Sequence, residues 1–241
     1  MVDELWQRIN AVEEDHWWFR GRRTLIDKML SLYLPTHSIL ELLDVGAGSG
    51  KNMTLLTPYG RVQGLDPFPQ NGTNIIKGRA ENLPFLSGRF DSVTAFDVLE
   101  HIEDEQTALQ EMIRVLKPKG FLFLTVPAGP HLWSDHDVAN GHYRRYTKET
   151  LQVLLNDASL QLLKLTYFNT LLYPLAAFSR KWRHRDDLKL PPLLLNHFLE
   201  RVFTLEASLL ATRDLPYGLS LLAVAKLAST SSHNAPSKTD K

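Results

Sequence analysis

The segment 42–50, with the sequence LLDVGAGSG, limits what this chain can fold into more than any other segment. Its apolar start predicts a buried strand that ends on the carboxylate of Asp44. Glycines follow at positions 46, 48 and 50, where a turn leads into a predicted helix. Because glycine has no Cβ, a ligand can lie against the backbone of such a turn, and the free N–H groups of the helix start face it. The segment therefore predicts a site for a nucleotide-like cofactor.

Two common nucleotide-binding turns do not fit this segment. A phosphate-binding P-loop needs a glycine five residues before the Gly50-Lys51 pair and a hydroxyl after it, but the sequence has Val45 and Asn52 there. A dinucleotide-binding turn needs its third glycine at position 51, which is lysine. An acid beside the turn also disfavours a pyrophosphate, whereas a cofactor with a cationic amino or sulfonium group tolerates one. The glycine spacing together with Asp44 therefore favours a cationic cofactor.

More motifs follow the glycine turn. A second predicted strand, 61–66, ends on Asp66, one βαβ step after Asp44. Three further segments complete the series: 78–85 (GRAENLPF), 90–101 (FDSVTAFDVLEH) and 115–124 (VLKPKGFLFL). In this order the motifs resemble those of class I S-adenosylmethionine-dependent methyltransferases of type 11/23, and the resemblance covers residues 39–127.

This resemblance implies S-adenosyl-L-methionine as the cofactor, lying across the first, second and fourth strands. It implies Asp44 and Asp97 near the cationic groups and Asp66 at the ribose. Ala80 and Glu81 are expected beside the adenine, although the family often has an acid at the position before them, where this chain has arginine. The predicted cofactor-binding residues are Asp44, Gly46, Ala47, Gly48, Gly50, Asp66, Ala80, Glu81 and Asp97.

Composition agrees with one enzyme domain. The chain has 241 residues, 44% of them hydrophobic, which is enough for the core of a single α/β domain. Acidic and basic residues balance at 27 each, so no overall field attracts nucleic acid. The absence of cysteine excludes disulfides, iron–sulfur clusters and cysteine-ligated zinc. The acidic N-terminus lacks the long apolar run of a signal peptide, so we expect a cytoplasmic protein.

The expected fold is an α/β, Rossmann-like, seven-stranded and mostly parallel sheet with helices on both faces, plus a helical insertion between strands six and seven. We expect a single methyltransferase domain over 1–228, with an N-terminal helical cap at 1–36, the insertion at 169–216, and a disordered polar tail at 229–241. The expected strands are 39–45, 61–66, 73–77, 90–97, 120–126, 160–168 and 217–227. The expected helices are 3–34 with a break near 15–21, 50–57, 104–116 and 147–157, and a long loop spans 128–146.

The insertion is predicted to contain two apolar helices, 170–183 and 192–212. Pro174 in the first and three charged residues in the second exclude transmembrane spans. Two interpretations stay open. The helices form a cap packed on the core, as most apolar helical stripes do. Alternatively, they form a lid for a greasy substrate or a peripheral membrane contact through 170–212, with the basic cluster 180–185 beside acidic headgroups.

Near the N-terminus, residues 16–23 (HWWFRGRR) place three aromatic side chains in a row. Adjacent helical residues point about 100° apart, so the three rings cannot all face one core. The segment resembles the HWWF-x-x-RR opening of a bacterial methyltransferase group. Either Trp17 and Trp18 fasten the first helix over the sheet, or His16 and a tryptophan close over the cofactor or the acceptor. All three are candidate substrate residues, and the two arginines at 22 and 23 are expected at the solvated surface.

The loop 128–146 follows the fifth strand, and ligands of open α/β sheets bind beyond the carboxyl ends of the strands. If the acceptor is a hydroxyl, a base must take its proton, and histidine titrates near neutral pH. The predicted base is His136 or His142, with Asp137 as the orienting partner. The alternative is that these polar side chains only hold the loop together by hydrogen bonds.

The end of this loop supplies further candidate substrate residues. Arg144 and Arg145 are predicted to hold an anionic acceptor by a fork of paired donors, and Tyr146 lies beside them. A metal site built from the loop residues at 131, 136 and 137 is not favoured, because methyl transfer to a phosphate, acid or amine needs no metal. We predict that no metal is bound.

The predicted function is therefore an S-adenosylmethionine-dependent methyltransferase. It is expected to O-methylate a small-molecule, glycan-linked or lipid-linked acceptor, hydrophobic or anionic, as a monomer or weak dimer and without nucleic acid. N- or carboxyl-methylation, a non-catalytic cofactor-binding module and an NAD-dependent oxidoreductase remain as alternatives.

Overall fold

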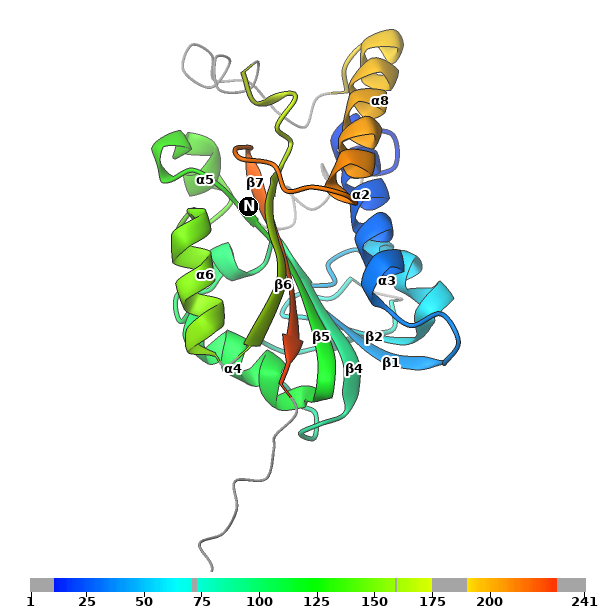
Figure 1. Cartoon of the computed structure of the whole chain (residues 1–241), viewed down its shortest axis with the longest axis vertical. Helices are drawn as coiled ribbons and strands as arrows, with labels where there is room; N and C mark the ends of the chain where they lie inside the picture. Colours follow the sequence, from blue (N-terminus) through cyan, green and yellow to red (C-terminus); the bar gives the residue numbers. More distant parts are fainter. Residues whose placement is uncertain (1–10, 71–72, 159, 175–189, 229–241) are drawn as a thin grey trace, which may run out of the picture.

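The computed structural model describes residues 11–70, 73–158, 160–174 and 190–228. Within them, seven strands form one sheet in the order β3-β2-β1-β4-β5-β7-β6 (Figure 1). Their bounds are β1 Leu40–Val45, β2 Gly60–Asp66, β3 Ile75–Lys77, β4 Phe90–Phe96, β5 Leu116–Pro127, β6 Leu160–Phe168 and β7 Ser220–Leu227. The strands from β3 to β5 are parallel, and β7 is antiparallel to both of its neighbours. The predicted seven-stranded, mostly parallel sheet is confirmed.

Helices cover both faces of this sheet (Figure 1). One face is covered by α4 (Glu105–Val115) and α6 (Lys148–Asp157). The other is covered by α2 (Trp17–Tyr33), α3 (Lys51–Leu56) and α8 (Leu193–Leu210). The shorter elements are α5 (Asp135–Ala139) and the 3-10 turns η1 (Thr57–Tyr59), η2 (Leu99–His101) and η3 (Pro130–Leu132).

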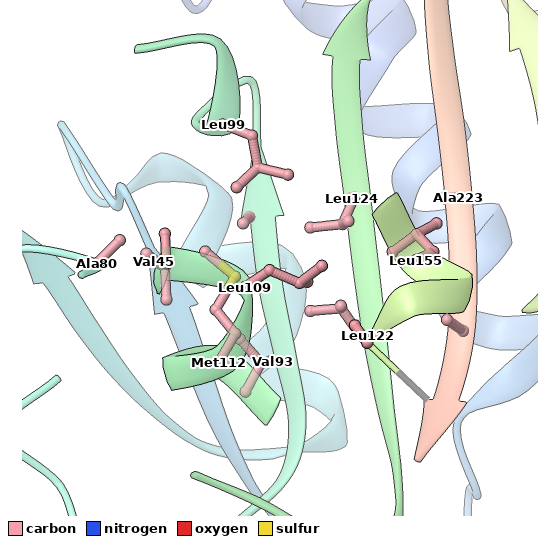
Figure 2. Close-up of a cluster of buried hydrophobic side chains, with 14 of the residues drawn as sticks. Val45, Ala80, Val93, Leu99, Leu109, Met112, Leu122, Leu124, Leu155 and Ala223 are labelled. Carbon is pink, nitrogen blue, oxygen red and sulfur yellow. The ribbon is translucent and has the colours of Figure 1, made fainter. Parts of the chain in front are cut away.

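Two apolar clusters fill the space between the sheet and its helices. The cluster under α4 and α6 includes Leu109, Met112 and Leu155, which pack against strand residues such as Leu124 (Figure 2). The cluster under α2 and α8 joins those helices to the opposite face around Phe203. Full burial of one such side chain contributes about 1.5–3 kcal/mol to stability. The ends of the parallel strands are therefore held on a well-packed base.

The helix boundaries follow local capping chemistry. The side chain of Asp104 accepts the Thr107 N–H at 3.0 Å and starts α4. Thr147 and Thr150 form the capping box that starts α6, as the sequence predicts. The fifth strand begins at Leu116 and not at 120, because α4 passes directly into β5 and a register shift beside β4 accommodates the extra residues.

Two predicted regions differ from expectation or lie outside the described residues. The loop 128–146 contains η3 and α5, and α5 begins with a capping box at Ser134 that the sequence analysis missed. The second inserted helix is confirmed as α8. Most of the first, with the basic cluster 180–185, lies outside the described residues, as does the tail 229–241. In the described part of the chain, no helix has the length and apolar character needed to cross a membrane.

Candidate active site at the carboxyl ends of the strands

The glycine turn after β1 is fixed by backbone bonds to β2. The N–H groups of Gly46 and Ala47 donate to the Leu65 carbonyl at 2.8 and 3.1 Å. The glycines at 46, 48 and 50 have φ angles of 72°, 54° and 80°, a region that L side chains rarely adopt. A Cβ placed on Gly46 would lie 2.4 Å from Cγ2 of Val98. Glycine at 46 is therefore required for close packing against the residues that follow β4, and not only for access by a ligand.

Asp66 ends β2 and joins that strand to the glycine turn. It is 4% exposed, and its Oδ2 accepts the Gly48 N–H at 2.9 Å while its Oδ1 accepts the Phe68 N–H at 2.8 Å. A carboxylate has about four lone-pair sites, so the group can accept further donors, such as a pair of hydroxyls. The structure thus brings together Gly48 and Asp66, two of the predicted cofactor residues.

Asp44, at the end of β1, is almost completely buried, with 1% of its surface exposed. The Thr94 hydroxyl donates to its Oδ1 at 2.7 Å, but its Oδ2 has no hydrogen-bond partner among the described residues. Burial raises the pKa of Asp44 to about 7, although the Thr94 bond and the charge of Arg22 act in the opposite direction. A buried acceptor left without a donor is unfavourable by about 1–3 kcal/mol. The position therefore suits a ligand that brings a cation or a donor.

The N-terminal segment reaches this corner, which the sequence analysis did not foresee. The Ser49 hydroxyl donates to Oε2 of Glu13 at 2.9 Å, and Nζ of Lys51 lies 3.7 Å from the same oxygen. Arg23 donates to the Glu13 carbonyl at 3.0 Å. Glu13 is 8% exposed, so the residues before α2 cover the glycine turn.

The predicted adenine-contacting residues differ in their surroundings. Ala80 is buried and belongs to the cluster under α4. Glu81 forms an ion pair with Arg79 at 2.5 Å near the surface. Arg79, which stands where the family often has an acid, is thus the partner of Glu81. The contact of Glu81 with the adenine stays a prediction.

Asp97 follows β4 and is paired within the protein. Its Oδ2 lies 2.6 Å from the Arg22 guanidinium, and its Oδ1 accepts the Thr125 hydroxyl at 3.1 Å. Arg22 is 7% exposed, so the expectation of a solvated side chain is wrong for this residue. The missed signal is helical spacing, because Arg22 shares a face of α2 with the buried residues Leu25, Ile26 and Met29.

The predicted base and its orienting partner are brought together in the loop after β5. Oδ1 of Asp137 accepts hydrogen bonds from Nδ1 of His142 at 2.9 Å and from Nε of Arg145 at 2.7 Å. Oδ2 accepts a hydrogen bond from the Ser134 N–H at 2.9 Å. Burial favours the protonated carboxyl, but the hydrogen bonds from His142 and Arg145 hold the pKa of Asp137 well below its usual range. With Nδ1 engaged, Nε2 of His142 is left for another partner. His136 lies exposed on α5, apart from this network.

His142 also belongs to a second group of polar side chains. One ligand-type atom from each of Glu100, His101 and His142 lies within 4.8 Å of the others, and the two imidazole centroids are 4.6 Å apart. Burial, with the adjacent Asp97, raises the pKa of Glu100 well above its usual range. Desolvation and the neighbouring His142 lower the pKa of His101 to about 4. The sequence analysis treated Leu99-Glu100-His101 only as a motif and named neither polar residue as a candidate.

The predicted acceptor-binding fork does not form. Arg144 donates to the Glu103 carbonyl at 2.7 Å and pairs with Glu105 at 3.0 Å, whereas Arg145 is buried with Asp137. The two guanidiniums are therefore held by different protein groups. Tyr146 is 3% exposed and its hydroxyl donates to Glu105, so burial, followed by that carboxylate, raises its pKa. We drop these three side chains from the proposed acceptor site.

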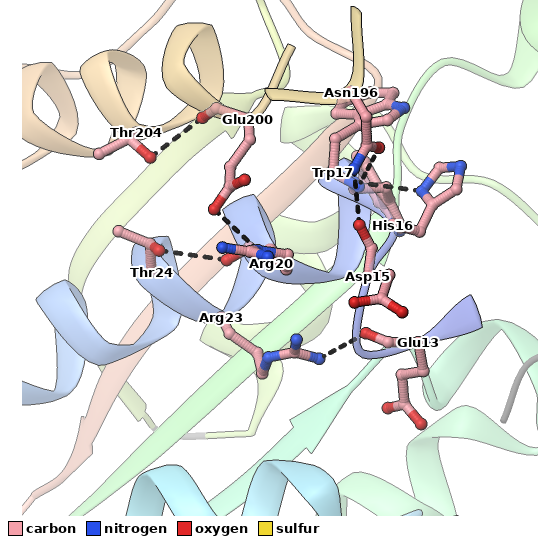
Figure 3. A network of polar contacts seen from close by, with 11 residues as sticks. Glu13, Asp15, His16, Trp17, Arg20, Arg23, Thr24, Asn196, Glu200 and Thr204 are labelled. Atoms are coloured by element: carbon pink, nitrogen blue, oxygen red, sulfur yellow. Dashed lines mark hydrogen bonds and ion pairs between the residues drawn. The ribbon is translucent and has the colours of Figure 1, made fainter. Parts of the chain in front are cut away.

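His16 and Trp17 lie where polar contacts join the start of α2 to α8 (Figure 3). His16 caps α2 by accepting the Trp18 N–H, and Asn196 of α8 accepts the Trp17 N–H at 2.9 Å. The Trp18 ring stacks on Phe168, with centroids 6.3 Å apart. These contacts favour the first of the two interpretations, in which the tryptophans fasten the N-terminal helix in place.

Comparisons with known proteins agree with this geometry. Residues 43–124 match a methyltransferase domain family model. The chain is 33% identical over 111 residues to 2-methyl-6-phytyl-1,4-hydroquinone methyltransferase 1, chloroplastic, of Oryza sativa subsp. japonica, a match over 40% of this chain and 34% of that relative. It is 33% identical over 92 residues to the ubiquinone/menaquinone biosynthesis C-methyltransferase UbiE of Shewanella sediminis, over 38% of this chain and 35% of the relative. The match thus spans about a third of the length of these curated relatives.

Solved structures share the fold over a larger part of the chain. A putative methyltransferase from Bacillus halodurans C-125 is 18% identical with a TM-score of 0.53, covering 85% of this chain and 99% of its own. A SAM-dependent methyltransferase from Archaeoglobus fulgidus is 19% identical with a TM-score of 0.55, covering 90% and 98%. At this identity the likeness shows the fold alone. The sequence match is thus to a methyltransferase domain over residues 43–124, and the solved structures share the fold of the chain around them.

Proposed function

We propose that this protein is an S-adenosylmethionine-dependent methyltransferase that acts on a hydroxyl of a small hydrophobic acceptor. The observation that carries the proposal is the buried Oδ2 of Asp44, which has no hydrogen-bond donor among the described residues and stands directly before the glycine turn. A cofactor with a cationic amino acid end supplies the donor that this oxygen lacks. The family match over the same residues supports the assignment.

Each part of this cofactor has a matching group in the chain. Asp44 would take its ammonium group, the backbone of 46–48 would lie along its amino acid end, and Asp66 would accept its ribose hydroxyls. When bound, the cofactor supplies a methyl group made electrophilic by a positively charged sulfur. The segment around Glu13 covers the glycine turn and would exclude water from it.

We assign the acceptor to the space beside His142. Asp137 fixes the Nδ1 proton of this imidazole, so the lone pair of Nε2 is left for the acceptor side. That lone pair can take the proton of a hydroxyl directly or bind a cation that makes the hydroxyl acidic. His142 is favoured because its Nδ1 is bonded to the buried Asp137, which orients the ring.

The surface of α8 favours a hydrophobic acceptor. Leu194, Leu193, Leu205 and Phe198 are 87%, 72%, 64% and 61% exposed, although they are large and apolar. Such a patch suits a greasy or lipid-linked substrate and a peripheral contact with membrane. Two curated relatives are named as a 2-methyl-6-phytyl-1,4-hydroquinone methyltransferase and as a ubiquinone/menaquinone biosynthesis C-methyltransferase, names that point to hydrophobic compounds.

Transfer to a ring carbon is a second candidate, favoured by one observation. The Shewanella relative is named as a C-methyltransferase. A phenol must lose its proton before either its oxygen or its ring carbon attacks a methyl group, so the same side chains serve both outcomes. The two products have the same mass, so their free hydroxyls are acetylated before mass spectrometry; the O-methyl ether takes up one acetyl group fewer than the C-methylated product.

Calorimetry with each cofactor tests the proposal. We expect S-adenosylmethionine to bind and NAD not to bind, and Asp66→Ala to weaken binding of the former at least tenfold. Asp91→Asn is the matched control, because Asp91 accepts the Glu41 N–H at 2.9 Å but lies at the amino end of β4, at the opposite end of the strands from the site. Asp44→Asn is a second test in a variant that we expect to fold well. Unchanged affinity in both Asp66→Ala and Asp44→Asn, or tight binding of NAD alone, would overturn the assignment.

Label transfer distinguishes an enzyme from a binding module. The protein is incubated with S-[methyl-³H]adenosylmethionine and a panel of phenolic and polyprenyl-phenolic acceptors. We expect label in the organic phase with the wild type and a loss of at least tenfold with His142→Ala. Cofactor binding without transfer to any acceptor in the panel or in a lipid extract would instead identify a non-catalytic module.

A further inference from the structure

We propose that Glu100, His101 and His142 bind one divalent first-row transition ion, of which Zn²⁺ is the representative. The sequence predicted no metal, and it considered only a different set of residues in the loop 128–146. His131 of that set contacts the Tyr173 hydroxyl at 3.2 Å, and Asp137 is occupied by Arg145. The proposed site is therefore new, and it joins the η2 turn to the loop after β5.

The donor set and its spacing are those of a metal site. Two imidazoles and one carboxylate have their donor atoms within 4.8 Å of one another. Such a set binds Zn²⁺ and related ions while leaving at least one coordination position open. Bonds of about 2.0–2.2 Å place neighbouring donors roughly 3–3.5 Å apart, so the three side chains need only converge slightly on the ion.

The carboxylate of Glu100 provides a second, independent observation. Glu100 is 1% exposed, its Oε2 has no hydrogen-bond partner, and it forms no ion pair with the described part of the chain. Its neighbours differ in this respect, since Asp97 is paired with Arg22 and Asp137 with Arg145. A buried carboxylate that is not paired directly with a protein cation either stays protonated or takes a cation from outside the chain. A metal ion held between Glu100 and the two histidines supplies that charge.

The surroundings of the two histidines also suit ligation. Asp137 accepts Nδ1 of His142, which leaves Nε2 as the metal-binding nitrogen. The backbone at Asn140 and Gly141 lies close to the His101 ring. A carboxylate or carbonyl behind each imidazole is the usual arrangement at metal sites, because it fixes the ring and strengthens it as a donor.

The site has a consequence that rests on the proposed function. An acceptor hydroxyl placed at the open coordination position would be made acidic by the ion, and its proton would pass to solvent. His142 then acts as a ligand, with Asp137 as its positioning residue. The Tyr143 N–H, which donates to the Glu100 carbonyl at 2.7 Å, would hold the loop and η2 together as the acceptor binds.

Metal binding is tested without cofactor or acceptor, so that its outcome is separate from that of the methyl transfer. Tag-free, full-length protein is treated with chelator, dialysed, and titrated with ZnCl₂ and CoCl₂ by calorimetry and visible absorption. We expect one equivalent of each ion and a visible Co²⁺ band. Glu100→Gln and His101→Ala should each weaken binding at least tenfold, and Asp137→Asn by about 10- to 100-fold.

His131→Ala is the matched control, because this histidine lies in the same loop but outside the proposed site. It should keep one equivalent and an unchanged Co²⁺ band. His101 is exposed, so its variant is expected to fold, and thermal melting of every variant checks this. The proposal is overturned if the wild type binds neither ion, or if His101→Ala binds as tightly as the wild type. Loss of binding in His131→Ala alone would also overturn it.

Discussion

The carboxylates at the ends of β1 and β2 differ from those at the ends of β4 and β5 in how they are neutralised. Asp44 and Asp66 are held by a hydroxyl and by backbone N–H groups. Asp97 is paired with Arg22 of the N-terminal helix α2, and Asp137 is paired with Arg145, which lies eight residues further along the same loop. Asp97 and Asp137 therefore have their positive partner within the protein. The carboxylates left with an unbonded oxygen, Asp44 and Glu100, identify where an external cation belongs.

The largest expected change in stability concerns Asp137, in the loop after β5. Arg145→Met leaves Asp137 fully buried without its cation, and we expect the free energy of unfolding to fall by about 3–5 kcal/mol. Arg144→Met is the control one residue away. Its pair with Glu105 is partly exposed, so it should cost less than about 1 kcal/mol. Equal losses for the two variants, measured by urea denaturation, would contradict the distinction.

Asp44→Asn should raise the free energy of unfolding, whereas Arg145→Met lowers it. In the wild type the raised pKa means that the folded protein binds more protons than the unfolded chain between pH 4 and about 7, so stability falls as pH rises through that window. The amide removes this dependence. We therefore expect a gain on the order of 2–4 kcal/mol at pH 8 and a much smaller gain at pH 5, together with weaker cofactor binding. A gain that is the same at both pH values would show that Asp44 is not held in this way.

The contact between the glycine turn after β1 and Val98 after β4 is tested at Gly46. Gly46→Ala combines the strain of φ 72° with a clash against Val98, and we expect a loss of about 2–3 kcal/mol. Gly88→Ala has a similar φ of 66° but nothing within 4 Å of the added Cβ, so it should lose only about 1 kcal/mol. Adding Val98→Ala should recover part of the difference in a double-mutant cycle. No recovery would place the strain elsewhere.

A smaller loss, about 1–2 kcal/mol, is expected for Arg22→Met. This variant removes the cation from Asp97, but that side chain is 32% exposed and water can reach it. The difference in the free energy of unfolding between this variant and Arg145→Met therefore measures how much access of water reduces the cost of removing a carboxylate's partner. A loss as large as that of Arg145→Met would show that Asp97 is effectively sealed from water.

The region near the glycine turn could be predicted from sequence because its chemistry is local. Asp44, Gly48 and Asp66 are placed by strand ends and by backbone conformations that glycine alone favours, and both signals are visible in a short window. The seven strands follow from hydrophobic patterns in the same way. The late start predicted for β5 is an exception, because a helix that passes directly into a strand leaves no turn signal.

The other half of the site could not be predicted, because its partners are far apart in the chain. Nothing near Glu100 in sequence shows that His142 will lie beside it. Likewise, the pairing of Asn196 with the backbone of Trp17 spans 179 positions. The histidine–aspartate pair was predictable only because its members are five residues apart, across the end of α5.

The bond between Ser49 and Glu13 has a practical consequence for anyone handling the protein. A cofactor entering the glycine turn must pass, or displace, the residues that immediately precede α2. Substitution of Glu13 should therefore change how quickly ligands enter and leave the turn, which stopped-flow binding measurements would show.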